Sequence, residues 1–246
     1  MPSDKKVALV TGATRGIGFE TARQLGQKGI TVVVGGRTQQ EAKDAADKLV
    51  ADNVEAYPVT LDITKDADRK AAVSFVAEKF GKLDILVNNA GVGGEGGLLN
   101  AHTIETTQEE FEWVFNTNLF SVVATTREFL PLIKKSPAGR IVNLASIVGS
   151  LTLQAMPQSP IAPFKAFAYN ASKTALNQFT VHLAAELLST NIKVNSAHPG
   201  WVKTELGTQH AQMEIADGAK TSVELALIGE DGPHGKFIHL GKELPW

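Results

Sequence analysis

The segment VALVTGATRGIG, residues 7–18, decides the fold of this chain. Residues 7–10 form a short apolar run, and glycines follow it at positions 12, 16 and 18, before a segment with helical spacing. Glycines in such a turn let a phosphate approach the backbone N–H groups at a helix N-terminus. Their spacing, G-x-x-x-G-x-G, differs from the general G-x-G-x-x-G fingerprint. The segment therefore predicts a strand, a phosphate-binding turn and a helix.

The same order of strand and helix continues along the chain. Apolar or β-branched runs at 31–36, 55–63, 82–91, 139–146, 193–200 and 235–241 join the run at 7–12 as predicted strands. Helical spacing lies between them, at 17–29, 38–53, about 65–80, 107–135 and 169–190. Buried strands that alternate with helices predict a parallel sheet with helices on both faces. We expect one α/β domain over 1–246, a doubly wound Rossmann fold with a mostly parallel seven-stranded sheet.

Composition excludes several functions. The 246-residue chain is 43% hydrophobic and 20% charged, as in soluble globular proteins, and its net charge of −2 argues against nucleic-acid binding. Cysteine is absent, which rules out disulfides and thiolate chemistry. The six histidines show no H-x-x-x-H pattern, so no metal is expected. No apolar stretch is long enough for a secretory signal or a membrane span, and we expect a cytoplasmic protein with no membrane partner.

The end of the second predicted strand indicates which dinucleotide is bound. In NAD-selective sites an acidic residue after this strand binds the ribose 2′-hydroxyl. Here Gly35-Gly36 leads into Arg37, and the next acidic residue is Glu41. Arg37 is placed to bind a 2′-phosphate, and Arg15 in the glycine turn can add a second cation. Two solvated surface arginines are the alternative; we predict NADP(H).

Other polar residues also follow predicted strands, where ligands of doubly wound sheets bind. Asp62 is a candidate for the edge of the adenine pocket, although capping of the next helix explains it nearly as well. Asn88 and Asn89 are candidates for bonds to backbone and cofactor, although asparagines after a strand are usually turn residues.

The sequence YNASK, residues 169–173, places a tyrosine and a lysine on one face of a predicted helix. Alone, Tyr169 and Lys173 would more often be an ordinary surface pair with an extended lysine. Their surroundings favour a functional role, because the preceding strand ends at Ser146 and the helix before that strand carries Asn118.

Together these motifs resemble the short-chain dehydrogenase/reductase family, in the branch whose members are about as long as this chain. The matching features are T-G-x-x-x-G-x-G at 11–18, N-N-A-G at 88–91, Asn118, Ser146, Y-x-x-x-K at 169–173 and P-G at 199–200. Each motif is weak alone, whereas the whole set in the family's order is specific.

The resemblance implies a role for each of four residues. Tyr169 would be the general acid in ketone reduction and the base in alcohol oxidation. Lys173, with the positive nicotinamide, would lower the pKa of Tyr169 and would hold the nicotinamide ribose. Ser146 would bind the substrate oxygen, and Asn118 would position a water that joins Lys173 to solvent. The cofactor would perform the hydride transfer.

The resemblance also completes the expected cofactor site, with Pro199-Gly200 behind the nicotinamide. The cofactor-binding half would span about 1–140 and the catalytic and substrate-binding part about 141–246. His198, beside that proline, is more often structural than catalytic at such a position. The expected cofactor contacts are Gly12, Thr14, Arg15, Gly16, Ile17, Gly18, Arg37, Leu61, Asp62, Ile63, Asn89, Ala90, Gly91, Tyr169, Lys173, Pro199, Gly200, Val202 and Thr204.

The chain departs from the family pattern between Ser146 and Tyr169, which lie 23 positions apart, more than in many members. Carbonyl reductases that act on varied ketones carry an insertion there too. We expect the extra residues to form a wall of the substrate pocket, although a loop without such a role is the alternative. The candidate pocket residues are Met156, Ile161, Phe164 and Trp201. The insertion also leaves the oligomeric state undecided: we expect a homodimer or a homotetramer, and a monomer is the alternative.

Three functions compete. The first is NADPH-dependent reduction of a ketone or aldehyde, reversible as alcohol oxidation. The second is reduction of acyl groups on an acidic carrier protein, which requires a cationic patch such as Arg127, Lys134, Lys135 and Arg140 beside the site. The third is a non-catalytic NADP(H)-binding regulator, which has no need of the four catalytic residues together. We predict the first.

Overall fold

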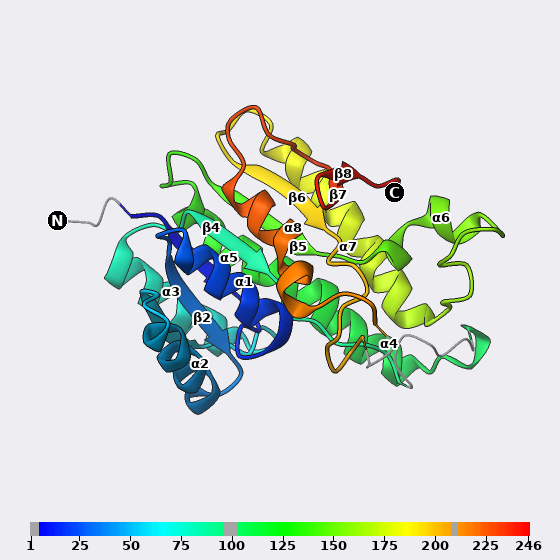
Figure 1. Ribbon diagram of the computed structural model, residues 1–246, viewed down its shortest axis with the longest axis horizontal. Helices are drawn as coiled ribbons and strands as arrows, with labels where there is room; N and C mark the ends of the chain where they lie inside the picture. The colour runs from blue at the N-terminus through cyan, green and yellow to red at the C-terminus, as the bar shows by residue number, and fades with distance from the viewer. Residues whose placement is uncertain (1–4, 96–102, 208–210) are drawn as a thin grey trace.

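The computed structural model describes residues 5–95, 103–207 and 211–246. Eight strands in these ranges form one sheet in the order β3-β2-β1-β4-β5-β6-β7-β8 (Figure 1). The strands are β1 (Val7–Val10), β2 (Thr31–Gly36), β3 (Ala56–Thr60), β4 (Ile85–Asn88), β5 (Arg140–Leu144), β6 (Lys193–Ala197), β7 (Phe237–His239) and β8 (Lys242–Glu243). All pairs from β3 to β7 are parallel. The predicted doubly wound α/β fold is confirmed.

The last strand differs from the prediction. Residues 235–241 were expected to form one final strand, but β7 ends at His239 and pairs antiparallel with β8. Leu240 and Gly241, between them, have positive φ angles of 45° and 75°. Two positive φ angles in a two-residue loop build a tight hairpin. The sheet therefore has eight described strands rather than seven. The sequence did not predict the hairpin, because leucine at the first loop position is not a typical turn residue.

Two layers of helices cover the sheet (Figure 1). Strand side chains alternate between the faces, so Val7 and Leu9 join one core whereas Ala8 and Val10 join the other. The first core is covered by α3 (Asp66–Phe80), α5 (Ser121–Ile133) and α7 (Phe167–Glu186). The second is covered by α1 (Gly16–Gln27), α2 (Gln39–Ala51) and α8 (Ile215–Leu227), the last of which the sequence did not predict. None of the described helices is long and apolar enough to cross a membrane.

The predicted helix at 107–135 is not continuous. It consists of α4 (Gln108–Phe115), a π-helical segment (Asn116–Phe120) and α5. A π segment widens the helix locally and is frequent at functional sites. In this segment only Asn118 is buried, and it is fully so. The insertion before α7 holds a 3₁₀ turn (Ile147–Gly149) and α6 (Leu151–Ala155), and a further 3₁₀ turn lies at Thr103–Glu105.

Candidate active site

The glycine turn after β1 packs against the loop that follows β4. Gly12 and Gly16 have φ angles of 60° and 58°, in the left-handed region that favours glycine. A Cβ on Gly18 would lie 2.3 Å from Nδ2 of Asn89, and a Cβ on Gly12 would lie 3.0 Å from Cα of Ala90. Backbone packing therefore requires glycine at positions 12 and 18.

The same turn opens α1 with free backbone donors. Arg15 occupies the N-cap position, and its side chain does not cap the helix. The first N–H groups of a helix have no intrahelical acceptor, and they attract anions. Thr14 packs against the end of β2, since a Cβ on Gly36 would lie 2.7 Å from its Cγ2, and Ile17 packs on the core of this face. The turn thus fits a pyrophosphate, as the sequence predicts.

Asn89 braces the glycine turn. Its Nδ2 donates to the carbonyl oxygens of Thr11 and Gly12, at 2.8 and 3.0 Å. Thr11 Oγ1 accepts from the N–H groups of Asn89 and Ala90, both at 3.0 Å. The loops after β1 and β4 are therefore one hydrogen-bonded unit. The amide donor of Asn89 serves this unit, and its contact with a cofactor stays a prediction.

Asn88 is a structural residue rather than a cofactor contact. Its Nδ2 donates to Thr126 Oγ1 at 2.9 Å and to Asn143 Oδ1 at 2.8 Å. Asn143 Nδ2 donates to Thr180 Oγ1 at 2.9 Å, and Ser196 Oγ donates to the same oxygen at 2.8 Å. All five side chains are buried. This network links β4, β5 and β6 to α5 and α7, and the sequence did not reveal it.

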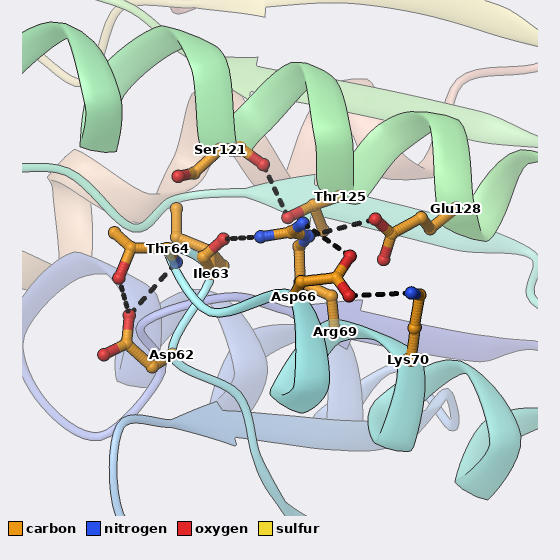
Figure 2. Close-up of polar contacts among 9 residues, drawn as sticks. All are labelled: Asp62, Ile63, Thr64, Asp66, Arg69, Lys70, Ser121, Thr125 and Glu128. Carbon is orange, nitrogen blue, oxygen red and sulfur yellow. Dashed lines mark hydrogen bonds and ion pairs between the residues drawn. The ribbon is translucent and has the colours of Figure 1, made fainter.

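The loop after β3 is held by Arg69 of α3, which in turn pairs with Glu128 of α5 (Figure 2). Asp62 Oδ1 accepts from the backbone N–H and the hydroxyl of Thr64, at 3.1 and 2.7 Å, and so forms a turn. The alternative of a helix cap is wrong, because Lys65 occupies the N-cap position of α3. Arg69 Nη1 donates to the carbonyl of Ile63 at 2.8 Å. The side chains of Leu61 and Ile63 are buried in the core, so their predicted cofactor contacts are limited to the backbone.

The two arginines predicted to bind the 2′-phosphate lie in different surroundings. Arg37 is exposed just beyond β2, and it pairs with none of the described residues. Arg15 forms an ion pair with Glu205, with 2.7 Å between Nη2 and Oε2, and the side chains are 72% and 76% exposed. The sequence did not predict this pair, which joins the glycine turn to the segment after β6.

That segment runs beside the glycine turn. A Cβ on Gly16 would lie 3.7 Å from Thr204 Cγ2, so Thr204 faces the turn. Val202 is buried and forms a parallel bridge with Met213. Gly200, after Pro199, has a φ of 92°, and a Cβ there would lie 2.1 Å from Met213 Sδ. These positions are compatible with the expected nicotinamide site, and their cofactor contacts stay predictions.

Asn118 is held from both ends of its amide. Its Oδ1 accepts from the N–H of Val92 at 2.8 Å, and its Nδ2 donates to the carbonyl of Val92 at 2.9 Å and to Ser172 Oγ at 3.1 Å. A Cβ on Gly91 would lie 3.2 Å from Asn118 Oδ1 and 3.5 Å from Lys173 Nζ. The π segment therefore turns Asn118 toward the end of β4 and toward Lys173. Both amide hydrogens of Asn118 are thus used, whereas Oδ1 accepts a single bond and keeps a second lone pair.

Tyr169 and Lys173 meet inside the protein. Lys173 Nζ donates to the carbonyl of Leu144 at 2.8 Å, and burial lowers the pKa of Lys173 to about 8. Burial raises the pKa of Tyr169 to about 12, against an opposing hydrogen bond with Ser146. In the chain alone the pKa of Tyr169 is therefore raised, because burial outweighs the hydrogen bond with Ser146; the expected lowering includes the positive nicotinamide and stays a prediction. Tyr169, Lys173 and Ser146 nevertheless lie together as predicted.

The insertion packs on the catalytic tyrosine candidate. Ile161 belongs to the buried cluster that contains Tyr169, and Phe164 packs against that cluster. Trp201 approaches from the segment after β6, with its ring 6.0 Å from that of Phe164. Met156 is 41% exposed and lies outside the cluster, so the structure does not place it with the other three candidates.

A hollow of about 410 Å³ lies on the other side of α7. Its apolar wall includes Leu151, Phe167, Ala171 and Ala175. It shares no residue with the predicted cofactor or catalytic sets, so we do not assign it to the active site. No group of three or more potential metal ligands occurs in 5–95, 103–207 or 211–246.

Comparison with known proteins adds to this geometry. The family model described as short chain dehydrogenase matches residues 6–215. The chain belongs to the short-chain dehydrogenase family. Among family members, carbonyl reductase (NADPH) 1 of Mus musculus is 31% identical over the whole length of both chains.

Solved structures of short-chain dehydrogenases show the same fold. An NADPH-bound carbonyl reductase from chicken fatty liver has a TM-score of 0.84 and 27% identity, covering 98% of this chain and 99% of that one. A substituted actinorhodin polyketide ketoreductase with NADPH has a TM-score of 0.81 and 32% identity, covering 98% and 97%. This chain is therefore similar both to carbonyl reductases and to a polyketide ketoreductase.

Proposed function

We propose that this chain is an NADPH-dependent reductase of ketones or aldehydes, reversible as an alcohol dehydrogenase. The observation that carries the proposal is the meeting of Tyr169, Lys173 and Ser146 beside the loops that form the glycine-turn unit. Family membership and the likeness to carbonyl reductases support it. The reaction class follows from the chemistry of these groups.

The glycine turn, with the first N–H groups of α1, would hold the pyrophosphate of NADPH. Arg37 and Arg15 would bind the 2′-phosphate, since two guanidinium groups at this edge match its charge. Lys173 would bind the nicotinamide ribose. NADPH, when bound, supplies the hydride that the carbonyl carbon receives.

The residues of the chain would then transfer one proton to the carbonyl oxygen and replace it from solvent. Tyr169 is neutral at pH 7, because its pKa is raised by burial, so it can donate its hydroxyl proton to the carbonyl oxygen. Ser146 would donate a hydrogen bond to the same oxygen as negative charge develops there. The Lys173 ammonium would stabilise the phenolate left on Tyr169. A water beside Asn118 and Lys173 would return the proton from solvent, and the product is an alcohol.

Reduction of acyl groups on a carrier protein is the second candidate, favoured by the likeness to a polyketide ketoreductase. The cationic patch that the sequence offered does not support it. Arg140 is buried, and its guanidinium donates to the carbonyls of Gly139, Asn191, Ile228 and Gly229. Arg140 also begins β5, and Lys134 and Lys135 lie between the end of α5 and this strand, whereas Ser146 follows the strand's end. These three cations therefore lie at the opposite edge of the sheet from Ser146. We therefore favour free carbonyl compounds.

The direct test is to follow oxidation of NADPH and of NADH with ketones, aldehydes, diketones, quinones and a β-ketoacyl thioester. Turnover of simple carbonyl compounds with NADPH supports the first function. Turnover of the thioester alone supports the second, and NADPH binding without any reduction supports the regulator. The cytoplasmic location and the oligomeric state stay predictions from the sequence.

A further inference from the structure

His198 follows β6 and lies between two turns of the candidate site. One is the Ser146 turn, residues 146–149, and the other is the Gly200 turn, residues 199–200. The side chain is 7% exposed. Its Nδ1 faces the backbone N–H of Ile147 at 3.2 Å and that of Gly200 at 3.4 Å. A single ring nitrogen therefore accepts from both turns.

Both contacts require a lone pair on Nδ1, so the proton of the neutral ring is on Nε2. Burial and the neighbouring His239 lower the pKa of His198 to about 3, which keeps the ring neutral. His239 Nδ1 lies 2.8 Å from the carbonyl of His198, and a carbonyl only accepts, so His239 donates there. The N–H of His198 donates to the carbonyl of Ile238 at 2.8 Å. The backbone of His198 is thus anchored to β7 through both its N–H and its carbonyl.

The Ser146 turn needs an acceptor of this kind. Ile147 is the first residue of a 3₁₀ helix, so its N–H has no partner within the helix. Ser146 precedes it, and its hydroxyl does not cap the helix. On the other side, Thr174 Oγ1 donates to the carbonyl of Gly149 at 3.0 Å and ties the turn to α7. His198 supplies the missing acceptor and leaves the Ser146 hydroxyl for the substrate oxygen.

We propose that His198 is a positioning residue that fixes the Ser146 turn relative to the Gly200 turn through its Nδ1 acceptor. The inference rests on the proposed function, in which Ser146 binds the substrate oxygen and Gly200 backs the nicotinamide. His198 acts through the two turns and takes no proton in the reaction. Because a displacement of about 1 Å can cost a factor of about 100 in rate, a loss of this acceptor reduces kcat.

Two isosteric variants separate the acceptor from the shape of the side chain. His198→Asn carries a carbonyl oxygen at the same bond distance from Cβ as Nδ1, whereas His198→Leu carries a methyl group there. The Leu variant is expected to lose about 10- to 100-fold in kcat for ketone reduction, with the NADPH dissociation constant changed by less than about threefold. The Asn variant is expected to keep kcat within about threefold of the unaltered protein. Equal losses in both variants, or full activity of the Leu variant, overturn the proposal.

Amide hydrogen exchange at Ile147 and Gly200 provides a readout independent of activity. Protection at both amides is expected to fall about 10-fold or more in His198→Leu and to persist in His198→Asn. Unchanged protection in the Leu variant overturns the proposal. Should that variant not fold, His198→Gln, whose carbonyl lies one bond further out, takes its place with the same expectation. If the unaltered protein reduces no carbonyl compound, the proposed function fails, while the exchange data still decide whether His198 holds the turns.

Discussion

Lys173 Nζ lies 5.6 Å from the centre of the Tyr169 ring, and both side chains are buried. Burial moves their pKa values to about 8 for Lys173 and about 12 for Tyr169, so at pH 7 the lysine keeps its positive charge and the tyrosine is neutral. Paired titratable groups with such shifts are a feature of acid–base sites. The chain thereby keeps Tyr169 as a proton donor, which is the form that carbonyl reduction needs.

The charge of Lys173 predicts a pH dependence. In the proposed mechanism the protonated lysine is active, and above its pKa of about 8 the proton is lost. At low NADPH concentration, kcat/KM for NADPH should be constant below about pH 7.5 and fall about tenfold per pH unit above about pH 8.5. Tyr169 stays protonated over this range, because its pKa is about 12. The Lys173→Arg variant keeps its positive charge over this range, so its residual activity should not fall above pH 8.5. If kcat/KM of the unaltered protein stayed constant up to pH 9.5, the proposed role of the Lys173 charge would be refuted.

Arg37 should decide between NADPH and NADH. In Arg37→Asp, the carboxylate repels the 2′-phosphate and the guanidinium is gone, so the NADPH dissociation constant should rise about 100-fold or more. The NADH constant should change by less than about threefold, since NADH has no phosphate there. Titration calorimetry measures both. Lys48→Asp, the same charge change at the far end of α2, is the control, and equal effects of both variants on NADPH would contradict the assignment.

The ion pair of Arg15 with Glu205 should compete with the cofactor. Glu205→Gln releases the guanidinium for the 2′-phosphate, and an exposed pair is worth about 0.2–1 kcal/mol. The NADPH dissociation constant should therefore fall by up to about fivefold, with no change for NADH. The gain should shrink as salt is added. Unchanged NADPH affinity would contradict a competition between Glu205 and the phosphate for Arg15.

The anchor of the loop after β3 should be sensitive to single substitutions. Arg69 Nε lies 3.1 Å from Glu128 Oε1, and the side chains are only 9% and 15% exposed. Removing one member of such a pair leaves a buried charge, so Arg69→Met should cost about 3 kcal/mol in the free energy of unfolding. Adding Glu128→Met should restore part of it by removing the unpaired carboxylate, whereas the hydrogen bond of Arg69 with the Ile63 carbonyl stays lost. Urea titration of both variants measures this, and a double variant no more stable than Arg69→Met would show that no such coupling exists.

Short-range patterns predicted much of this molecule. Strand and helix periods identified the doubly wound sheet, and the i, i+4 spacing placed Tyr169 and Lys173 on one face of α7. The end of β5 located Ser146. Gly12 and Gly18 were predicted as a phosphate turn, and the structure adds that packing against the loop after β4 also requires them. These features depend on neighbours within a few residues.

Contacts between distant segments were not predictable in this way. Ile147 and His198 are 51 positions apart, and Asn88 and Asn143 are 55 apart. Sequence position alone could not show that the buried amide of Asn88 serves the sheet rather than a cofactor. The π segment around Asn118 was hidden because its apolar spacing continues that of the flanking helices. The raised pKa of Tyr169 likewise depends on burial, which the motif does not encode.

The central claim is that Tyr169 donates the proton to a carbonyl compound reduced with NADPH. The most direct test compares kcat of Tyr169→Phe and the unaltered protein on a ketone that the latter reduces, together with NADPH binding. We predict a loss of about 100-fold or more in kcat, with the NADPH dissociation constant within about threefold. Turnover by the phenylalanine variant near that of the unaltered protein would contradict the account.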